Sequence, residues 1–252
     1  MLLKGDSPRR RSLSERPSSL PATLSLERQV PLSLAKRATA EGVGTALLLA
    51  TVVGSGIMAT RLSGGNLALV LLANSLATGA GLTALILSLG SISGAHFNPV
   101  VTLSEAFLGR RAWSEVPVYV AAQILGAFSG VAVAHGMFGE AIFSASHRAR
   151  SGPGQFLSEF IATFGLLAVL WACSHRRVDS LPFAVGGYIT AAYWFTASTS
   201  FANPAVTLAR SMTDSFTGIR LADAPLFLVA QVLGAAGATL FAWWLSPRNH
   251  EA

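Results

Sequence analysis

Two short Asn-Pro segments, each set between long apolar stretches, constrain this chain more than any other feature. The first is Asn98-Pro99-Val100 and the second is Asn203-Pro204-Ala205. Asn is a favoured N-cap and Pro is favoured at the first helical position, so each segment predicts a helix start. Each predicted helix runs only about 10 residues, to Leu108 and Ser215, which is about half of a ~30 Å hydrocarbon core. The sequence therefore predicts two half-helices.

The composition indicates a membrane protein. Of the 252 residues, 52% are hydrophobic and only 12% are charged, whereas a globular domain carries about 25% charged residues. The net charge of +6 does not predict a nucleic-acid partner, because the basic residues fit better as topology signals in a lipid bilayer. The single cysteine, Cys173, excludes an internal disulfide and offers no metal cluster.

Six apolar stretches are long enough to predict membrane crossings. Residues 1–35 lack a sustained apolar run and predict a disordered, basic cytoplasmic tail. The membrane domain is expected to occupy residues 36–252, with crossings at residues 38–59, 67–89, 116–137, 156–173, 181–197 and 224–245.

The two halves of this domain, about residues 38–137 and 156–246, repeat three landmarks in the same order. The landmarks are a Glu early in the first crossing (Glu41, Glu159), the Asn-Pro segment, and Ala-Gln-hydrophobic-Leu-Gly-Ala in the last crossing (Gln123, Gln231). Each half has three crossings, so equivalent elements must run in opposite directions. The half-helices then enter from opposite faces and meet near the midplane, where irregular backbone is tolerated if it lines an aqueous cavity. This arrangement predicts a pore.

The distribution of basic residues predicts the orientation. With the N-terminus in the cytoplasm, an even number of crossings returns the C-terminus to the same side. All but five of the 18 Lys and Arg residues then lie in the cytoplasm, as the positive-inside rule expects. The five on the outside are Arg61, Arg148, Arg150, Arg210 and Arg220.

These motifs, in this order and spacing, resemble the aquaporin and glycerol-facilitator family, also called major intrinsic proteins. The resemblance covers about residues 38–246. It implies an all-α aquaporin-like fold, with six transmembrane helices and two re-entrant half-helices in two inverted repeats. It also implies a homotetramer with one pore per subunit, passive conduction of water and small uncharged solutes, and no catalysis, cofactor or metal.

The residues themselves suggest how such a pore selects. If each Asn side-chain oxygen caps its helix, the amide donors of Asn98 and Asn203 are free to bind a solute oxygen. Two half-helix N-termini at the midplane would oppose cations. No crossing carries a chain of acids, Lys and His suited to proton relay, so coupled transport has little support.

The sequence departs from the family pattern at two positions. Val100 stands where the family usually has Ala, and Val206 stands where it usually has the Arg of the outer filter. Counting without gaps places the four filter residues at Thr78, Ala191, Ser200 and Val206, although an alternative alignment replaces Thr78 by Ala80. We therefore expect a wider, less polar filter that admits polyols, urea or neutral metalloid hydroxides such as arsenous acid.

Several other polar residues have both a functional and a structural interpretation. Arg210 follows Val206 by four residues, on the same helical face, and either replaces the missing filter Arg or only contacts solvent and lipid phosphate. His96 either senses pH or braces its loop. Glu41, Glu159, Gln123 and Gln231 are expected to support the re-entrant loops by hydrogen bonds.

Three classes of function remain open from the sequence. A passive channel conducts down a gradient regardless of membrane potential, and it is either solute-permeable or strictly water-selective. A coupled secondary transporter depends on an ion gradient. A scaffold protein conducts nothing. A bacterial inner membrane is the expected location, because the sequence carries no other targeting signal.

Overall fold

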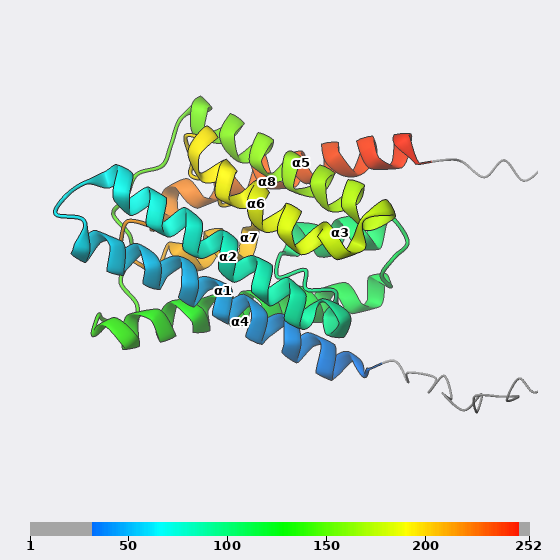
Figure 1. The fold of residues 1–252 in the computed structure, drawn as a ribbon, viewed down its shortest axis with the longest axis horizontal. Coiled ribbons are helices and arrows are strands. Elements are labelled where there is room, and N and C mark those ends of the chain that lie inside the picture. The colour runs from blue at the N-terminus through cyan, green and yellow to red at the C-terminus, as the bar shows by residue number, and fades with distance from the viewer. Residues whose placement is uncertain (1–31, 247–252) are drawn as a thin grey trace, which may run out of the picture. The chain divides into compact units, whose positions relative to one another are not determined.

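Residues 32–246 form a bundle of eight α-helices in the computed structural model, which describes this part of the chain (Figure 1). Residues 1–31, which hold most of the predicted tail, and residues 247–252 lie outside the described range. The first half of the bundle contains α1 (Leu34–Leu62), α2 (Leu67–Ser93), α3 (Pro99–Phe107) and α4 (Val116–Phe138). The second contains α5 (Pro153–Arg176), α6 (Leu181–Phe195), α7 (Pro204–Arg210) and α8 (Ala224–Leu245). No strand occurs within residues 32–246.

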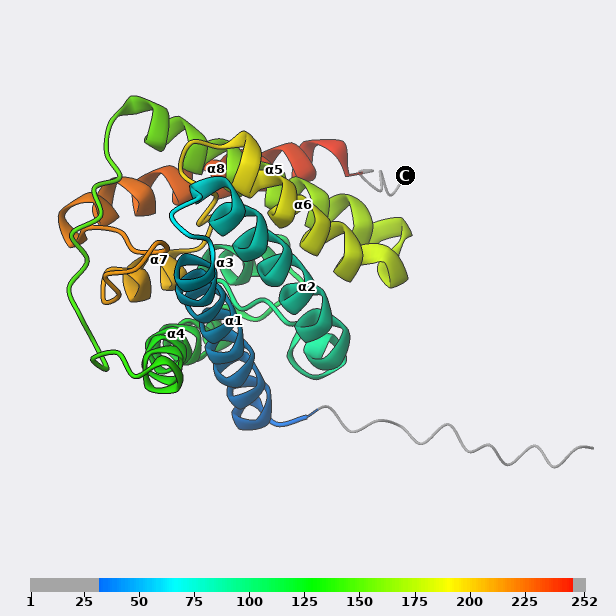
Figure 2. The ribbon, with the colours of Figure 1, turned by 60° about the vertical axis from the view of Figure 1, so that its left-hand side comes forward.

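Equivalent helices of the two halves run in opposite directions, as the odd number of crossings per half predicts. Figure 1 shows α1 beginning at the end of the bundle where α8 finishes; we call this the near end and the opposite one the far end. The short α3 enters from the near end and α7 from the far end. Residues 139–152 join the two halves and cross the far end (Figure 2).

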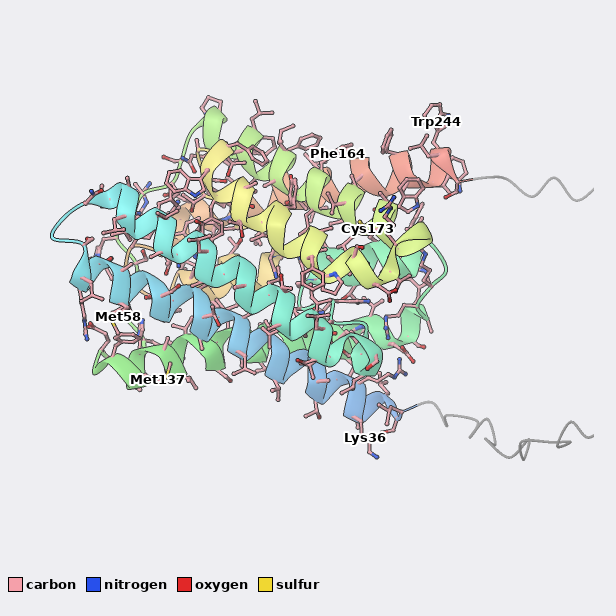
Figure 3. All side chains as sticks on the ribbon, in the orientation of Figure 1. Lys36, Met58, Met137, Phe164, Cys173 and Trp244 are labelled. Atoms are coloured by element: carbon pink, nitrogen blue, oxygen red, sulfur yellow. The ribbon has the colours of Figure 1, made fainter. Side chains whose placement is uncertain are left out.

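Five helical segments of the described chain are long and apolar enough to cross a membrane: 34–62, 67–93, 113–138, 153–174 and 221–245. The sixth predicted crossing is α6, which has 15 residues and spans about 22 Å. A 3₁₀ turn, η2 (Val178–Ser180), precedes it. Similar turns, η1 (Trp113–Glu115) and η3 (Leu221–Asp223), precede α4 and α8. Lys36 and Trp244 mark the near end of the bundle (Figure 3).

Close helix packing depends on small residues at equivalent places in the two halves. α1 packs against α4, and α5 packs against α8. A Cβ atom at Gly126 would overlap the Gly42 carbonyl, and one at Gly234 would overlap the Phe160 carbonyl. These two glycines therefore let the helix backbones touch, which is the usual way that membrane helices associate.

The second half-helix is shorter than the sequence predicted. α7 ends at Arg210 rather than near Ser215. After Arg210 the chain folds back, since Ile219 N donates to the Arg210 carbonyl at 3.2 Å and the Arg210 Nε donates to the Thr217 carbonyl. In this compact turn, the Arg210 carbonyl accepts a hydrogen bond from Ile219 and not from a further turn of helix.

Candidate functional site

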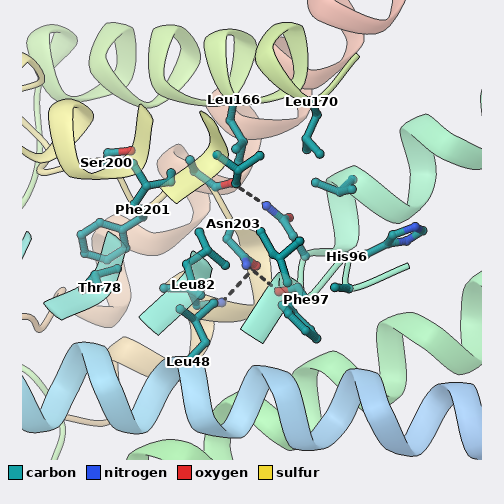
Figure 4. A pocket seen from close by; sticks show the side chains of 18 of the residues that line it. Leu48, Thr78, Leu82, His96, Phe97, Leu166, Leu170, Ser200, Phe201 and Asn203 are labelled. Carbon is teal, nitrogen blue, oxygen red and sulfur yellow. Dashed lines mark hydrogen bonds between the residues drawn. The ribbon is translucent and has the colours of Figure 1, made fainter. Parts of the chain in front are cut away.

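A cavity of about 300 Å³ follows the axis between the two halves and passes the point where α3 and α7 meet. One wall is apolar, and side chains of α1, α2, α5 and α6 form it. The opposite wall is formed by residues 94–98 and 200–203 of the two re-entrant segments. Figure 4 shows residues of both walls around Asn203. The apolar wall includes Leu48, Leu82, Leu166, Leu170 and Ile189.

Asn98 and Asn203 lie at the centre of this cavity and bind each other's loops. Asn98 Nδ2 donates to the Ala202 carbonyl at 2.8 Å, and Asn203 Nδ2 donates to the Phe97 carbonyl at 2.7 Å. Each side-chain oxygen caps its own half-helix, at Val100 N and at Ala205 N. An amide has two N–H donors, so one donor of each Asn is used by the structure and one is left for a solute. The sequence had predicted that both donors are free.

The residues that follow the two asparagines pack the tips of the half-helices. Pro99 and Pro204 occupy the first helical positions, as predicted. Val100 and Ala205 are buried at the tips and do not line the cavity. The larger Val100 instead lines an apolar groove between α3 and α8.

Glu41 of α1 holds the first re-entrant loop with one carboxylate. Its oxygens accept hydrogen bonds from Ser93 Oγ at 2.7 Å, His96 N at 2.9 Å and Phe97 N at 2.7 Å. Gln123 of α4 donates to the same carboxylate at 2.8 Å. Buried donors of the loop are therefore satisfied by an acid from the crossing helix, which is the supporting role that the sequence predicted.

Glu159 of α5 makes the equivalent contacts with the second loop. It accepts from Phe201 N and from Ala202 N, both at 2.9 Å, and from Gln231 Nε2 at 2.6 Å. Non-glycine residues in this loop have positive φ angles: Thr199 at 62°, Ser200 at 50° and Ala202 at 49°. Backbone with positive φ is strained at non-glycine residues. The hydrogen bonds that the loop donates to Glu159 therefore help to keep the loop in the conformation that positions Asn203.

Four buried side chains surround the cavity between the asparagines and the far end: Thr78, Tyr193, Ser200 and Val206. We call these four residues the far-end ring. Thr78 lines this part and Ala80 is exposed, so the first of the two alignments fits the structure. The Thr78 and Tyr193 hydroxyls are 3.2 Å apart. Ser200 Oγ is buried and has no hydrogen-bond partner among the described residues.

Ala191, which the sequence predicted as a filter residue, does not belong to the far-end ring. It is exposed on α6, and the α6 residues that line the cavity are Leu181, Val185, Ile189 and Tyr193. A residue two positions from both Ile189 and Tyr193 is turned about 200° away on a helix. The predicted ring of four small side chains therefore contains a tyrosine, and it is narrower and more polar than the sequence suggested.

Arg210 lines the same part of the cavity although it is only 1% exposed. Its Nε donates to the Thr217 carbonyl, and its guanidinium carbon lies 3.4 Å from the centre of the Phe201 ring. Within residues 32–246, no carboxylate pairs with it and its two terminal nitrogens have no hydrogen-bond partner. These nitrogens supply donors and a positive charge next to Val206.

A second buried guanidinium, that of Arg150, supports the far end, and sequence reasoning had counted it only as an outer charge. It donates to carbonyls of Gly218 at 2.8 Å, Ser198 at 2.8 Å and Phe216 at 3.2 Å. Burial, followed by repulsion from Arg210, lowers the pKa of Arg150 to about 9. Arg150 thus joins the second re-entrant loop to the segment after α7. The sequence gave no signal for this role, because nothing distinguishes Arg150 from the neighbouring Arg148 in the same connecting segment.

The near-end opening of the cavity carries His96 and Arg111. His96 Nδ1 lies 3.0 Å from Thr102 Oγ1, which braces the loop against α3. Arg111 donates to the Ser93 carbonyl at 2.9 Å and pairs with Glu115 at 2.9 Å. The Glu105 carboxylate also lines the cavity on this side and pairs with Arg110 at 3.1 Å. Among the described residues, no cluster of three or more His, Cys, Asp or Glu could hold a metal ion.

Comparison with known proteins agrees with this geometry. Residues 29–193 match the family model "Major intrinsic protein". The chain is 52% identical to aquaglyceroporin AqpS of Rhizobium meliloti over 215 residues, which cover 85% of this chain and 92% of AqpS. It is 33% identical to the probable aquaporin NIP7-1 of Arabidopsis thaliana, over 78% of this chain and 71% of that protein.

A solved structure also has the same fold. The aquaglyceroporin from Plasmodium falciparum superposes with a TM-score of 0.67 at 24% identity, over 84% of this chain and 95% of that one. The inverted halves, the paired Asn-Pro half-helices and these matches together show that the chain belongs to the major intrinsic protein family.

Proposed function

We propose that this protein is a passive membrane channel for water and small uncharged solutes, including polyols and urea. The observation that carries this proposal is the pair of asparagines. Asn98 and Asn203 lie at the centre of a cavity between the two halves, and each has one amide hydrogen left for a solute oxygen. Proteins of this family are channels and not enzymes.

The far-end ring supports passage of solutes larger than water. Val206 and Ser200 are small, and the Ser200 hydroxyl has no protein partner in the described range. The Tyr193 and Thr78 hydroxyls and the terminal nitrogens of Arg210 add polar groups around the same space. A solute with several oxygens, such as glycerol or a neutral metalloid hydroxide, can replace its lost hydration there. The similarity to a protein named an aquaglyceroporin agrees with this class of solute.

We propose that Arg210 serves as the cationic residue of the filter. Its guanidinium lines the cavity beside Val206, is fixed by Thr217 and Phe201, and has no carboxylate partner among the described residues. A buried positive charge in a narrow pore opposes cations, including hydronium. Arg210→Ala is therefore expected to raise proton leakage while water still passes.

Purified protein in liposomes tests the proposal directly. Osmotic shrinkage in sucrose reports water flux, and re-swelling in glycerol, urea or arsenous acid reports solute flux. We expect both fluxes to exceed those of empty liposomes at least tenfold and to be independent of membrane potential. Shrinkage without re-swelling would indicate a strict water channel. Dependence on an ion gradient would indicate a coupled transporter.

We further propose a homotetramer in a bacterial inner membrane, with both termini in the cytoplasm. Large apolar side chains are exposed on helix faces turned away from the cavity, including Leu76, Phe183 and Trp194, and such faces suit lipid or neighbouring subunits. The distribution of basic residues along the sequence supports the orientation. Native mass spectrometry would test the assembly against the subunit mass of 26.2 kDa.

A further inference from the structure

Arg210 presents a buried guanidinium to the cavity that has no ion-pair partner within residues 32–246. Its Nε donates to the Thr217 carbonyl, so the N–H groups of both terminal nitrogens remain for a ligand. A buried charge without a counter-charge is unfavourable in a protein interior. A ligand that carries a negative charge would therefore stabilise this site.

A second guanidinium makes this part of the protein more positive. The guanidinium carbons of Arg210 and Arg150 lie 3.4 and 5.0 Å from the centre of the same Phe201 ring. Arg150 donates to backbone carbonyls and to the Thr199 hydroxyl, and these groups carry no net charge. Two positive charges are thus held beside one aromatic ring at low dielectric.

The buried carboxylates on this side do not balance both guanidinium groups. Glu159 accepts from backbone N–H groups of the re-entrant loop and is not among the described residues that line the cavity. Asp223 pairs with Arg220 at 2.9 Å and accepts from the backbone N–H of Arg150. Glu159 therefore compensates for one of the two buried guanidinium groups at most, and one positive charge is left in excess beside Arg210.

The far-end ring adds neutral donors next to this charge. Ser200 Oγ is buried and has no hydrogen-bond partner among the described residues. The Thr78 and Tyr193 hydroxyls are 3.2 Å apart, and either can donate to the other, so one proton of the pair is left for a ligand. Thr78 and Ser200 lie on the side of Asn203 away from His96 (Figure 4). A guanidinium fork with hydroxyl donors beside it suits the oxygens of an anion.

We propose that Arg210 and the far-end ring form a binding site for a small planar oxyanion, such as nitrate or a short carboxylate, which obstructs the flux of neutral solutes when it is bound. Two oxygens in one plane match the planar guanidinium fork, and the charge of the anion supplies the missing counter-charge. The small side chain of Val206 leaves space beside the guanidinium. The binding site goes beyond the proposed function, whereas its effect on flux rests on that function.

The middle of the cavity explains why the anion would obstruct the pore rather than cross it. Leu48, Leu82 and Leu166 form the apolar wall around the asparagines (Figure 4). Asn98 and Asn203 each have one amide hydrogen left, which is a weak replacement for a guanidinium and a hydration shell. A small anion is therefore much less stable at the centre than at the far-end ring, and it blocks solutes from the ring.

Liposomes that contain the whole protein test the inference in sodium nitrate and in sodium gluconate, with the same salt at equal concentration on both sides. Nitrate is the anion of a strong acid, so no neutral form crosses the bilayer. Gluconate has the same charge but is too large for the ring. Re-swelling in glycerol is measured for the wild type, Arg210→Gln, Ser200→Ala and Arg148→Gln. Arg148→Gln is the matched control, because Arg148 is an exposed arginine near the same end and does not line the cavity.

We expect nitrate to reduce glycerol permeability at least threefold relative to gluconate in the wild type and in Arg148→Gln. Ser200→Ala keeps the charge and loses one donor, so it should need at least twice the nitrate concentration for the same inhibition. In Arg210→Gln the two salts should give the same permeability. Equal wild-type permeability in both salts would overturn the inference, as would inhibition that persists in Arg210→Gln.

Thermal unfolding of the purified protein tests binding without flux. A ligand that binds only the folded state raises the unfolding temperature. Changing gluconate for nitrate should therefore shift this temperature upward by several degrees in the wild type and in Arg148→Gln, relative to the shift in Arg210→Gln, which reports general salt effects. Equal shifts in the wild type and Arg210→Gln would contradict the anion site. A wild type that conducts glycerol in neither salt but keeps the shift that depends on Arg210 would contradict the proposed function and support the site.

Discussion

Replacement of Glu159 should inactivate the pore while leaving the helix bundle folded. The carboxylate accepts from Phe201 N and Ala202 N, each at 2.9 Å. Hydrogen bonds to a charged acceptor contribute about 1.5–3 kcal/mol each, so these two contribute about 3–6 kcal/mol to holding the loop. Gln231 adds a third bond to the same group.

The loop needs about as much stabilisation as Glu159 provides. Three of its residues, Thr199, Ser200 and Ala202, have left-handed backbone angles, and each costs roughly 1–2 kcal/mol. The strain of about 3–6 kcal/mol therefore matches the two bonds. In Glu159→Ala both N–H groups lose their acceptor, the loop relaxes, and Asn203 leaves the centre of the cavity.

Stopped-flow light scattering on liposomes measures the result. We expect Glu159→Ala to reduce water permeability at least tenfold, and Glu159→Gln to give an intermediate value because one acceptor oxygen remains. Circular dichroism should show unchanged helix content, since the long helices pack independently of this loop. Glu140→Gln is the control, because Glu140 forms only an exposed ion pair with Arg61. Wild-type water permeability in Glu159→Ala would refute the argument.

Three further predictions concern the filter, the packing and the far-end loops. Val206→Arg should suppress glycerol flux at least fivefold while water still passes, because it narrows the ring; equal loss of both fluxes would count against the filter assignment. Gly126→Ala should lower the thermal unfolding temperature by several degrees through overlap with the neighbouring helix, whereas Gly187→Ala, where a Cβ meets open space, should not. The backbone N–H of His147, followed by its side chain, lowers the pKa of Asp214. This pair therefore stabilises the folded loops above the ordinary carboxyl pKa and should weaken only below about pH 4, as hydrogen exchange of residues 143–148 would show.

The fold was predictable from the sequence because its signals are local and repeated. Asn98-Pro99 and Asn203-Pro204 mark helix starts by their capping chemistry alone, and the structure begins α3 and α7 at these prolines. The long apolar crossings follow from length and composition. The end of α7 was not predictable, because Arg210, Thr217 and Ile219 interact only after the chain has folded back.

The far-end ring was only partly predictable, for a geometric reason. Counting from the asparagines ignores the rotation of α6, and a shift of two residues exchanges an exposed Ala191 for a buried Tyr193. The spacing of Val185, Ile189 and Tyr193 at intervals of four was the available signal. The hydrogen bonds of the Asn98 side chain also could not be predicted in full. Its Nδ2 donates to the carbonyl of Ala202, which lies in the re-entrant loop of the other half of the chain.

The position of Arg210 gives a physical reason why valine is tolerated at residue 206. A filter arginine must place its guanidinium in the cavity. Because the side chain is long, the arginine can occupy more than one position in the sequence and still reach the cavity. Arg210 is one turn beyond Val206 on the same face of α7, and its side chain lies across the Phe201 ring. A small residue at 206 leaves space beside the guanidinium, whereas an arginine there would put two like charges together at low dielectric. We therefore expect valine at 206 and arginine at 210 to depend on each other, because the filter cation that we propose at 210 keeps a positive charge in the pore while the small residue at 206 leaves space for solutes.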